Sequence, residues 1–148
     1  MTDEELIIAE TRSGFEAWSA GDIDQIIARS SGAGAGLGFG FRTRDMRVVD
    51  SVDAQRTGLE AWFGTLERYK IEDIDVNCTV NGDIATVWGF YTEDFKHHGE
   101  DPEHLRVRYS MVRHQRNGDW QLVWNHRDIQ EFTDDGFYLK KPIQKPPT

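Results

Sequence analysis

The segment Arg116-Asn-Gly-Asp-Trp-Gln-Leu-Val-Trp-Asn-His-Arg-Asp128 decides how the second half of the chain folds. Its second and third residues are Asn117-Gly118, a dipeptide typical of a two-residue hairpin turn because both residues tolerate positive φ. The aromatic and β-branched residues that follow predict a strand from Trp120 to Phe132. Every second side chain of a strand lies on the same face. One face of this strand is therefore expected to carry Leu122, Trp124, His126 and Asp128.

The segments before this hairpin show the same two-residue alternation. The run from Arg106 to Gln115 alternates and is the expected partner strand. Further upstream, Asn81-Gly82-Asp83 is a second hairpin signal between the runs Ile71 to Val80 and Ile84 to Phe95. The sequence therefore predicts an antiparallel meander in the second half of the chain.

The first half shows helical spacing instead. Helices are predicted from Glu4 to Ala20, with Thr2 or Asp3 as the cap, from Ile23 to Arg29, and from Gln55 to Tyr69. A glycine-rich stretch at residues 30–41 separates the second and third helices, and its second half predicts a strand pressed close to a neighbour. Three helices followed by a meander indicate an α+β fold.

Composition limits the partners of the protein. The length of 148 residues predicts a single domain. The formal net charge of −9 repels phosphate groups, so we expect no binding to nucleic acid or membranes. The acidic N-terminus lacks the basic start of a secretory signal, which favours a cytoplasmic protein. A single cysteine, Cys78, excludes an internal disulfide. The expected domain spans residues 1–139, and residues 140–148 are an expected flexible tail.

Four segments, in this order and with compatible spacing, point to a known family. They are Ala17-Trp-Ser-Ala-Gly-Asp-Ile-Asp-Gln-Ile-Ile27, Gly58-Leu-Glu-Ala-Trp62, Gly82-Asp83-Ile-Ala85 and the hairpin from Arg116 to Asp128. Together they resemble the nuclear-transport-factor-2-like superfamily, in particular its SnoaL-like and ketosteroid-isomerase-like branch. The resemblance implies a cone-shaped, curved, mixed or antiparallel sheet, covered by three N-terminal helices and enclosing a pocket.

The resemblance also implies what lines the pocket and what enters it. Comparison with the family pattern turns Trp88, Phe90 and Thr92 inward on the long strand after the Asn81-Gly82-Asp83 hairpin signal. The expected ligand is a small apolar or aromatic molecule. Its expected lining is Trp18, Phe39, Trp62, Trp88, Phe90, Thr92, Met111 and Trp124.

Two registers of the last hairpin stay open, and they differ in the residue opposite His126. A two- or four-residue turn sets His126 against Tyr109, whereas a three-residue turn sets it against Arg108. Comparison with the family pattern favours the first register. In both, His126 is a candidate general base oriented by Asp128, and Tyr109 or Arg108 is a candidate oxyanion-stabilising group.

Two kinds of function are expected as alternatives. The acids of ketosteroid isomerase are missing, because their positions fall on Met111 and among Phe39 to Phe41, and its tyrosine position falls on Gly14. The first alternative is an enzyme of the lyase, isomerase, cyclase or hydrolase type that uses His126. The second is a non-catalytic ligand-binding or assembly domain that forms a homodimer through the outer face of the sheet.

One more segment, His97-His-Gly-Glu-Asp-Pro-Glu-His104, gathers three histidines and three acids that could ligate a transition metal. It matches no helical or finger spacing of metal ligands and falls in an expected loop. We therefore expect a solvated loop, with no metal and no cofactor.

Overall fold

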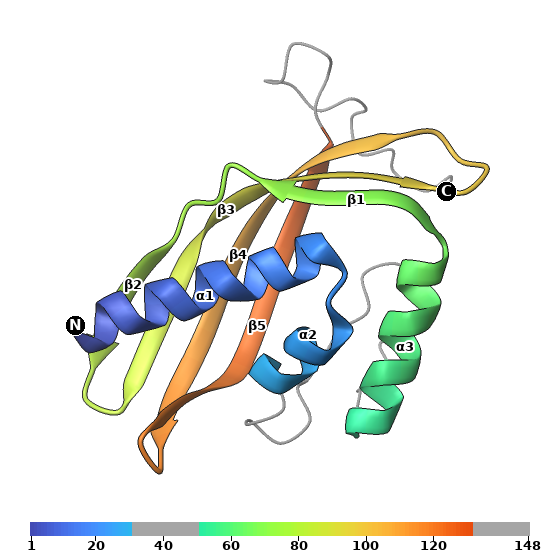
Figure 1. Cartoon of the computed structure of the whole chain (residues 1–148). Coiled ribbons are helices and arrows are strands. Elements are labelled where there is room, and N and C mark those ends of the chain that lie inside the picture. The colour runs from blue at the N-terminus through green and yellow to red at the C-terminus, as the bar shows by residue number, and fades with distance from the viewer. Residues whose placement is uncertain (31–50, 132–148) are drawn as a thin grey trace, which may run out of the picture.

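A computed structural model describes residues 1–30 and 51–131, and in this part of the chain three helices precede a five-stranded sheet (Figure 1). The elements are α1 (Asp3–Ala20), α2 (Ile23–Ser30), α3 (Val52–Gly64), β1 (Leu66–Glu72), β2 (Asn77–Asn81), β3 (Ile84–His97), β4 (Glu103–Arg116) and β5 (Asp119–Glu131). This order confirms the predicted α+β fold. The expected glycine-rich strand with Phe39 and the expected C-terminal tail lie outside the described residues.

Local side-chain hydrogen bonds set the ends of the first two helices. The Thr2 N–H donates to Glu5 Oε2 at 2.8 Å and the Glu5 N–H donates to Thr2 Oγ1 at 3.2 Å, so Thr2 is the cap of α1. Gly21 ends α1 with a φ of 66°, a conformation that glycine adopts without strain. Asp22 then begins α2, since its Oδ1 accepts from the Gln25 N–H at 3.2 Å. Both helices agree with the prediction to within a residue or two.

The third helix is shifted from its predicted place at both ends. It begins at Val52, because the Ser51 side chain accepts a hydrogen bond from the Ala54 N–H at 3.0 Å, and it ends at Gly64. The following residues, predicted to continue the helix, form β1 and pair with the end of β3. Leu66 fits the helical spacing, but pairing with a strand distant in sequence outweighs that local pattern.

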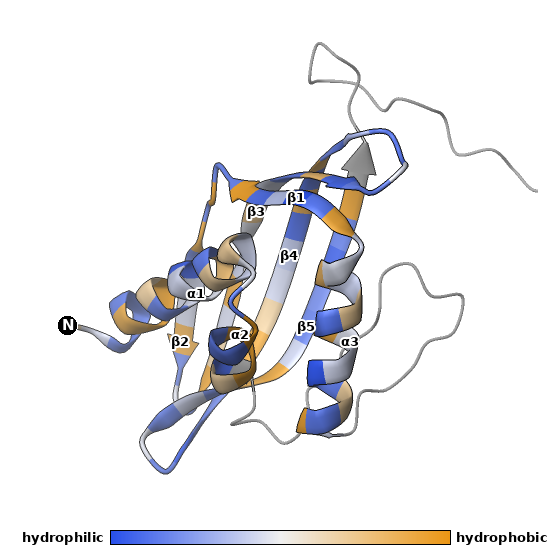
Figure 2. Ribbon diagram, turned by 45° about the vertical axis from the view of Figure 1, so that its right-hand side comes forward, coloured by the Kyte–Doolittle hydropathy of each residue, from blue (hydrophilic) through white to orange (hydrophobic). Residues whose placement is uncertain are grey.

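The described strand pairings are all antiparallel, in the order β1-β3-β4-β5, with β2 also paired to β3. β1 pairs with residues 92–97 and β2 with residues 84–88, so the two short strands share one edge of the sheet. The single strand predicted from Ile71 to Val80 is therefore wrong, and Asp73, with a φ of 50°, lies in the connection between the two strands. The sheet curves, and all three helices lie on one side of it, here called the concave side (Figures 1 and 2).

The β4–β5 hairpin has the predicted two-residue turn but a different register beyond it. The two residues of Asn117-Gly118 have φ values of 51° and 84°, as a type I′ turn requires. Pairing continues in that register as far as Arg113, after which a β-bulge at Val123 shifts it by one residue. His126 therefore lies opposite Ser110, and both predicted partners of His126 are wrong.

The main core lies between α1 and the concave face. It consists of Ile7, Phe15, Ile71, Val76, Ala85, Val87, Tyr91, Val107, Tyr109 and Trp120. A second, smaller cluster of Ala17, Ile26, Ile27 and Leu59 joins the three helices. None of the helices within residues 1–30 and 51–131 is long and apolar enough to cross a membrane.

Candidate functional site

Four polar side chains lie together among the aromatic residues of the concave side. They are Tyr69 on β1, Tyr91 and Glu93 on β3, and Arg127 on β5, and we call them the Glu93–Arg127 cluster. Glu93 is only 1% exposed, and its carboxylate accepts a hydrogen bond from Arg127 Nη1 at 3.1 Å. The same Nη1 donates to the Tyr91 hydroxyl oxygen at 2.7 Å. The cluster is thus a connected polar group inside an apolar layer.

Strand alternation and the bulge place these side chains. Tyr91 and Glu93 are two residues apart on β3, in the same phase as the buried Val87 and Phe95. Arg127 lies opposite Tyr109 on the concave face. It reaches this face because the bulge at Val123 reverses the alternation of β5 beyond that point.

Burial and neighbouring charge set the protonation of the cluster. Burial raises the pKa of Tyr91 to about 12. Burial also raises the pKa of Tyr69, and the negative charge of Glu93 adds to that effect. For Arg127, burial lowers the pKa, but Tyr91 and Glu93 outweigh it, so the pKa of the guanidinium is raised. At neutral pH both tyrosines are neutral and Arg127 carries its charge.

The hydrogen bond from Arg127 determines what Tyr91 can do. Because the Tyr91 oxygen accepts from the guanidinium, its own O–H must donate to a different acceptor. The nearby positive charge polarises that O–H, which suits it to a carbonyl, hydroxyl or carboxylate oxygen of a ligand. A donor polarised in this way can stabilise negative charge that develops on an acceptor oxygen.

Aromatic side chains surround the cluster, and two of them were predicted as ligand-binding residues. The Trp18 and Trp62 rings lie on the concave side with centroids 6.1 Å apart. Trp62 also meets Tyr69 edge-on at 5.0 Å, which connects α3 to the cluster. Met111, also predicted, packs partly buried against the same core, whereas Phe39 lies outside the described residues.

The other predicted ligand-binding residues lie on the opposite face of the sheet, here called the outer face. Trp88 is 42% exposed, Phe90 37% and Trp124 41%. Thr92 has the same phase on β3 and is buried against Asp73, whose Oδ2 accepts from its hydroxyl at 3.4 Å. Their predicted inward orientation is wrong, because on β3 the buried phase is that of Tyr91 and, on β5, the bulge turns Trp124 outward.

The predicted catalytic residues divide between the two faces. On the outer face, His126 Nε2 lies 3.2 Å from Asp128 Oδ1, and Arg108 Nη2 donates to Asp128 Oδ2 at 3.3 Å. Hydrogen bonds from Arg108 and then His126 hold the pKa of Asp128 below its usual value. The side chains of His126 and Asp128 are 57% and 52% exposed, so this chain of three residues is open to water.

Tyr109, the alternative partner of His126, lies on the concave face. Its hydroxyl donates to the Asp75 carbonyl oxygen at 2.6 Å, and burial raises its pKa. Tyr109 and His126 therefore lie on different sides of the sheet, and the structure does not bring them together.

Sequence reasoning missed all four residues of the cluster: Tyr69, Tyr91, Glu93 and Arg127. A signal for Glu93 was present, since a glutamate occupies the same alternation phase as Val87, Tyr91 and Phe95. A charged residue in the apolar phase of a strand indicates either an ion pair or a site. For Arg127 no such signal existed, because its phase depends on the bulge.

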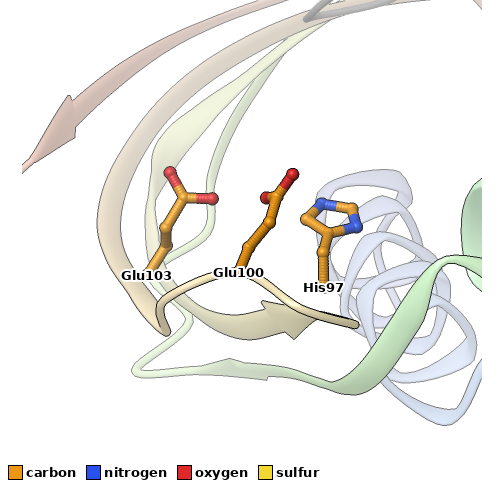
Figure 3. A group of neighbouring side chains, drawn as sticks. All are labelled: His97, Glu100 and Glu103. Atoms are coloured by element: carbon orange, nitrogen blue, oxygen red, sulfur yellow. The ribbon is translucent and has the colours of Figure 1, made fainter.

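The turn between β3 and β4 holds the one group of possible metal ligands found among the described residues. Single donor atoms of His97, Glu100 and Glu103 all lie within 4.8 Å of one another (Figure 3). The predicted solvated loop thus has a defined arrangement of donors.

Comparison with known proteins agrees with this architecture. The family model described as the SnoaL-like domain matches residues 11–127. No curated protein matches the chain.

Among solved structures, the CaMKII hub of S. rosetta has a TM-score of 0.65 at 15% identity, covering 87% of this chain and 98% of that one. A protein of the NTF2-like family from Streptomyces avermitilis, named as a candidate dehydratase, has a TM-score of 0.60 at 18% identity, covering 84% and 94%. An uncharacterised protein with a cystatin-like fold from Caulobacter vibrioides has a TM-score of 0.62 at 17% identity, covering 87% and 89%.

Proposed function

The chain belongs to the SnoaL-like family, and from that premise we propose that it binds a small, largely apolar cyclic or aromatic molecule on the concave side of the sheet. The ring system of this molecule packs among the aromatic residues around Trp18 and Trp62. One oxygen atom of the molecule accepts a hydrogen bond from Tyr91. The buried ion pair between Arg127 and Glu93 is the observation that carries the proposal.

A buried ion pair is a poor way to stabilise a fold. Here the side chain of Glu93 is 2% exposed and that of Arg127 23%. Removing charges from water costs free energy that their attraction does no more than offset, so apolar side chains of similar size often serve stability equally well. The pair does hold a positive charge beside the Tyr91 hydroxyl, with Glu93 fixing the guanidinium. A role in binding accounts for a charged pair here, whereas the fold alone does not require one.

Replacement of Tyr91 by phenylalanine tests the proposal. The ligand would first be found by native mass spectrometry of the purified protein or by screening cyclic compounds that bear one oxygen. Tyr91→Phe removes the donor to the ligand together with the acceptor of one Arg127 N–H, so affinity measured by calorimetry should fall about tenfold, equivalent to ~1.4 kcal/mol. Tyr109→Phe is the matched control, because its hydroxyl bonds to the Asp75 carbonyl. It should lower the melting temperature and leave the affinity unchanged.

Equal affinity in the wild type and Tyr91→Phe would contradict this role of the cluster. A double variant separates loss of binding from loss of folding. Arg127→Met combined with Glu93→Gln removes both charges together and leaves no single buried charge behind. That double variant should fold and bind the ligand weakly.

The enzymatic alternative requires a separate test, because the predicted base lies elsewhere. General-base catalysis by His126 with Asp128 and Arg108 on the outer face requires that His126→Ala abolish turnover of any substrate found, without changing the melting temperature. Turnover that survives in His126→Ala and is lost in Tyr91→Phe would instead assign the reaction to the concave side.

A second function, assembly as a homodimer, is favoured by the outer face. Trp88, Phe90 and Trp124 expose large apolar surfaces there. The charged residues beside them carry both signs, since Arg108 pairs with Asp128. A two-fold axis places each such patch against its copy, which requires a self-complementary surface of this kind.

Charge introduced into the outer face tests this assembly. Sedimentation at micromolar concentrations should show a dimer for the wild type and a monomer for Trp124→Glu. Val52→Glu is a suitable control, because Val52 on α3 is also exposed, at 43%, but lies away from the outer face. A wild type that stays monomeric at tens of micromolar would rule out the dimer.

A further inference from the structure

The turn that joins β3 to β4 brings three ligating side chains together on one side of the chain. Figure 3 shows the carboxylates of Glu100 and Glu103 and the ring of His97 raised above the turn. His97 is the last residue of β3, Glu103 is the first of β4, and Glu100 lies in the turn between them. The donor atoms lie within 4.8 Å of one another, although the three residues share no recognised metal-binding spacing.

Contacts outside the group fix the orientation and tautomer of His97. The Thr65 hydroxyl donates its single hydrogen to the Trp62 carbonyl oxygen at 2.6 Å. Its oxygen lies 2.8 Å from His97 Nδ1, and with the hydroxyl hydrogen on Trp62 this network assigns the ring hydrogen to Nδ1. The lone pair is therefore on Nε2. In Figure 3 one ring nitrogen faces Glu100 and the other faces away from the carboxylates, and since Nδ1 binds Thr65, the facing nitrogen is Nε2.

This arrangement is the one found behind histidine ligands of metals. A ligating imidazole donates its second N–H to a fixed acceptor, which holds the ring in place and keeps the other nitrogen deprotonated. The backbone at His97 is also fixed, because the N–H of the next residue, His98, donates to the Thr65 carbonyl oxygen at 2.9 Å. Trp62 and Phe95 pack against the ring, with centroids 6.3 and 5.4 Å away. The imidazole is thus preorganised and does not depend on the carboxylates for its position.

We infer that His97, Glu100 and Glu103 bind a divalent transition-metal ion of the zinc type. One imidazole nitrogen and two carboxylate oxygens are ligands typical of this class, and the nitrogen disfavours Mg²⁺ and Ca²⁺. The two carboxylates repel each other at this distance, and a divalent cation between them replaces that repulsion by attraction. Ligand atoms around tetrahedral zinc lie about 3.4 Å apart, so the donor atoms approach one another by roughly 1 Å on binding, a movement that the exposed Glu100 can supply.

The proposed ion leaves at least one coordination position to water, because the protein supplies three ligands. It also joins the end of β3 to the start of β4 and, through Thr65, to the end of α3. Binding should therefore stabilise this end of the sheet by mass action.

Calorimetric titration of the untagged, chelator-treated protein with Zn²⁺ tests the inference. One equivalent should bind. His97→Gln, Glu100→Gln and Glu103→Gln should each weaken binding at least tenfold. His98→Gln and His104→Gln are matched controls in the same segment and should bind as the wild type does. Mg²⁺ and Ca²⁺ at the same concentrations should give no heat.

Thr65→Val tests the positioning of His97. Loss of the hydroxyl should weaken Zn²⁺ binding about 10- to 100-fold, and Thr65→Ser should restore it. Glu100 is exposed, so Glu100→Gln keeps the test valid even if His97→Gln disturbs the packing against Trp62. Binding that is unaffected by Glu100→Gln, or that falls as much in His98→Gln as in His97→Gln, overturns the site.

Discussion

Gly89 lies where the connection between β1 and β2 approaches β3 closely at Asp75. The Asp75 N–H donates to the Phe90 carbonyl oxygen at 2.8 Å, and the Tyr109 hydroxyl donates to the Asp75 carbonyl oxygen at 2.6 Å. A Cβ on Gly89 would lie 2.1 Å from that carbonyl oxygen and 3.0 Å from the Tyr109 hydroxyl. The backbone approach at this point is therefore possible only for a residue without a side chain.

Gly89→Ala should therefore destabilise the protein. The new methyl group must displace the connection and strain the Tyr109 hydrogen bond, at a cost of about 1–3 kcal/mol in the free energy of unfolding. Urea denaturation measures this difference. Gly58→Ala is the control, because a Cβ there meets nothing within 4 Å and alanine is favoured inside a helix. It should be neutral or stabilising by up to about 1 kcal/mol, and a neutral Gly89→Ala would show that the connection moves freely.

At the scale of the elements, the sequence predicted correctly those helix and strand ends that are set by residues close in sequence. The caps Thr2 and Asp22 and the turn Asn117-Gly118 act within a few residues, and the elements beside them were predicted correctly. The end of α3 was not, because Leu66 fits helical spacing and only its pairing with β3 makes it part of a strand.

The bulge in β5 had the largest consequence for the candidate site. One inserted residue, Val123, moves every later residue of β5 to the opposite face of the sheet. His126 therefore points outward and Arg127 inward. No local pattern reveals that insertion, since the residues on both sides of it alternate well. The predicted contact between His126 and Asp128 is nevertheless present. Residues two apart on a strand share a face, whichever face of the sheet that is.

The proposed metal ligands, like the bulge, could not be predicted from local sequence patterns. Their spacing in sequence matched no known metal site. The hairpin brings the end of β3 and the start of β4 together, and Thr65, the residue that caps the end of α3, orients His97. Three elements contribute to one small group of atoms, so sequence alone supported only a solvated loop.

At the scale of the whole molecule, the two faces of the sheet have different chemistry. The concave side carries buried tyrosines and one ion pair, and the outer face carries exposed tryptophans and water-accessible charges. The same strands β3, β4 and β5 supply both faces. The proposed binding and the proposed assembly therefore use alternate residues of the same strands, and each can be changed by mutation without touching the other.

The buried tyrosines also predict how stability changes with pH. The pKa of Tyr91 rises from 10.0 in the unfolded chain to about 12 in the fold, mainly because of burial. Its contribution is fully present below pH 10 and is lost as the pH rises towards 12, since the unfolded state then releases a proton that the folded state retains. The loss amounts to about 2–3 kcal/mol. Urea denaturation at pH 9 and pH 11.5 measures it.

Tyr91→Phe isolates this effect from the other titrating groups. Burial, the largest cause of the raised pKa of Tyr69 and Tyr109, is the same in both proteins, so most of their contribution cancels when the two pH dependences are subtracted. The variant should lose less stability than the wild type between the two pH values, because phenylalanine has no proton to release. Parallel losses would mean that Tyr91 is hydrated in the folded protein, in which case its hydroxyl could not serve as the protected donor that the proposed ligand site requires.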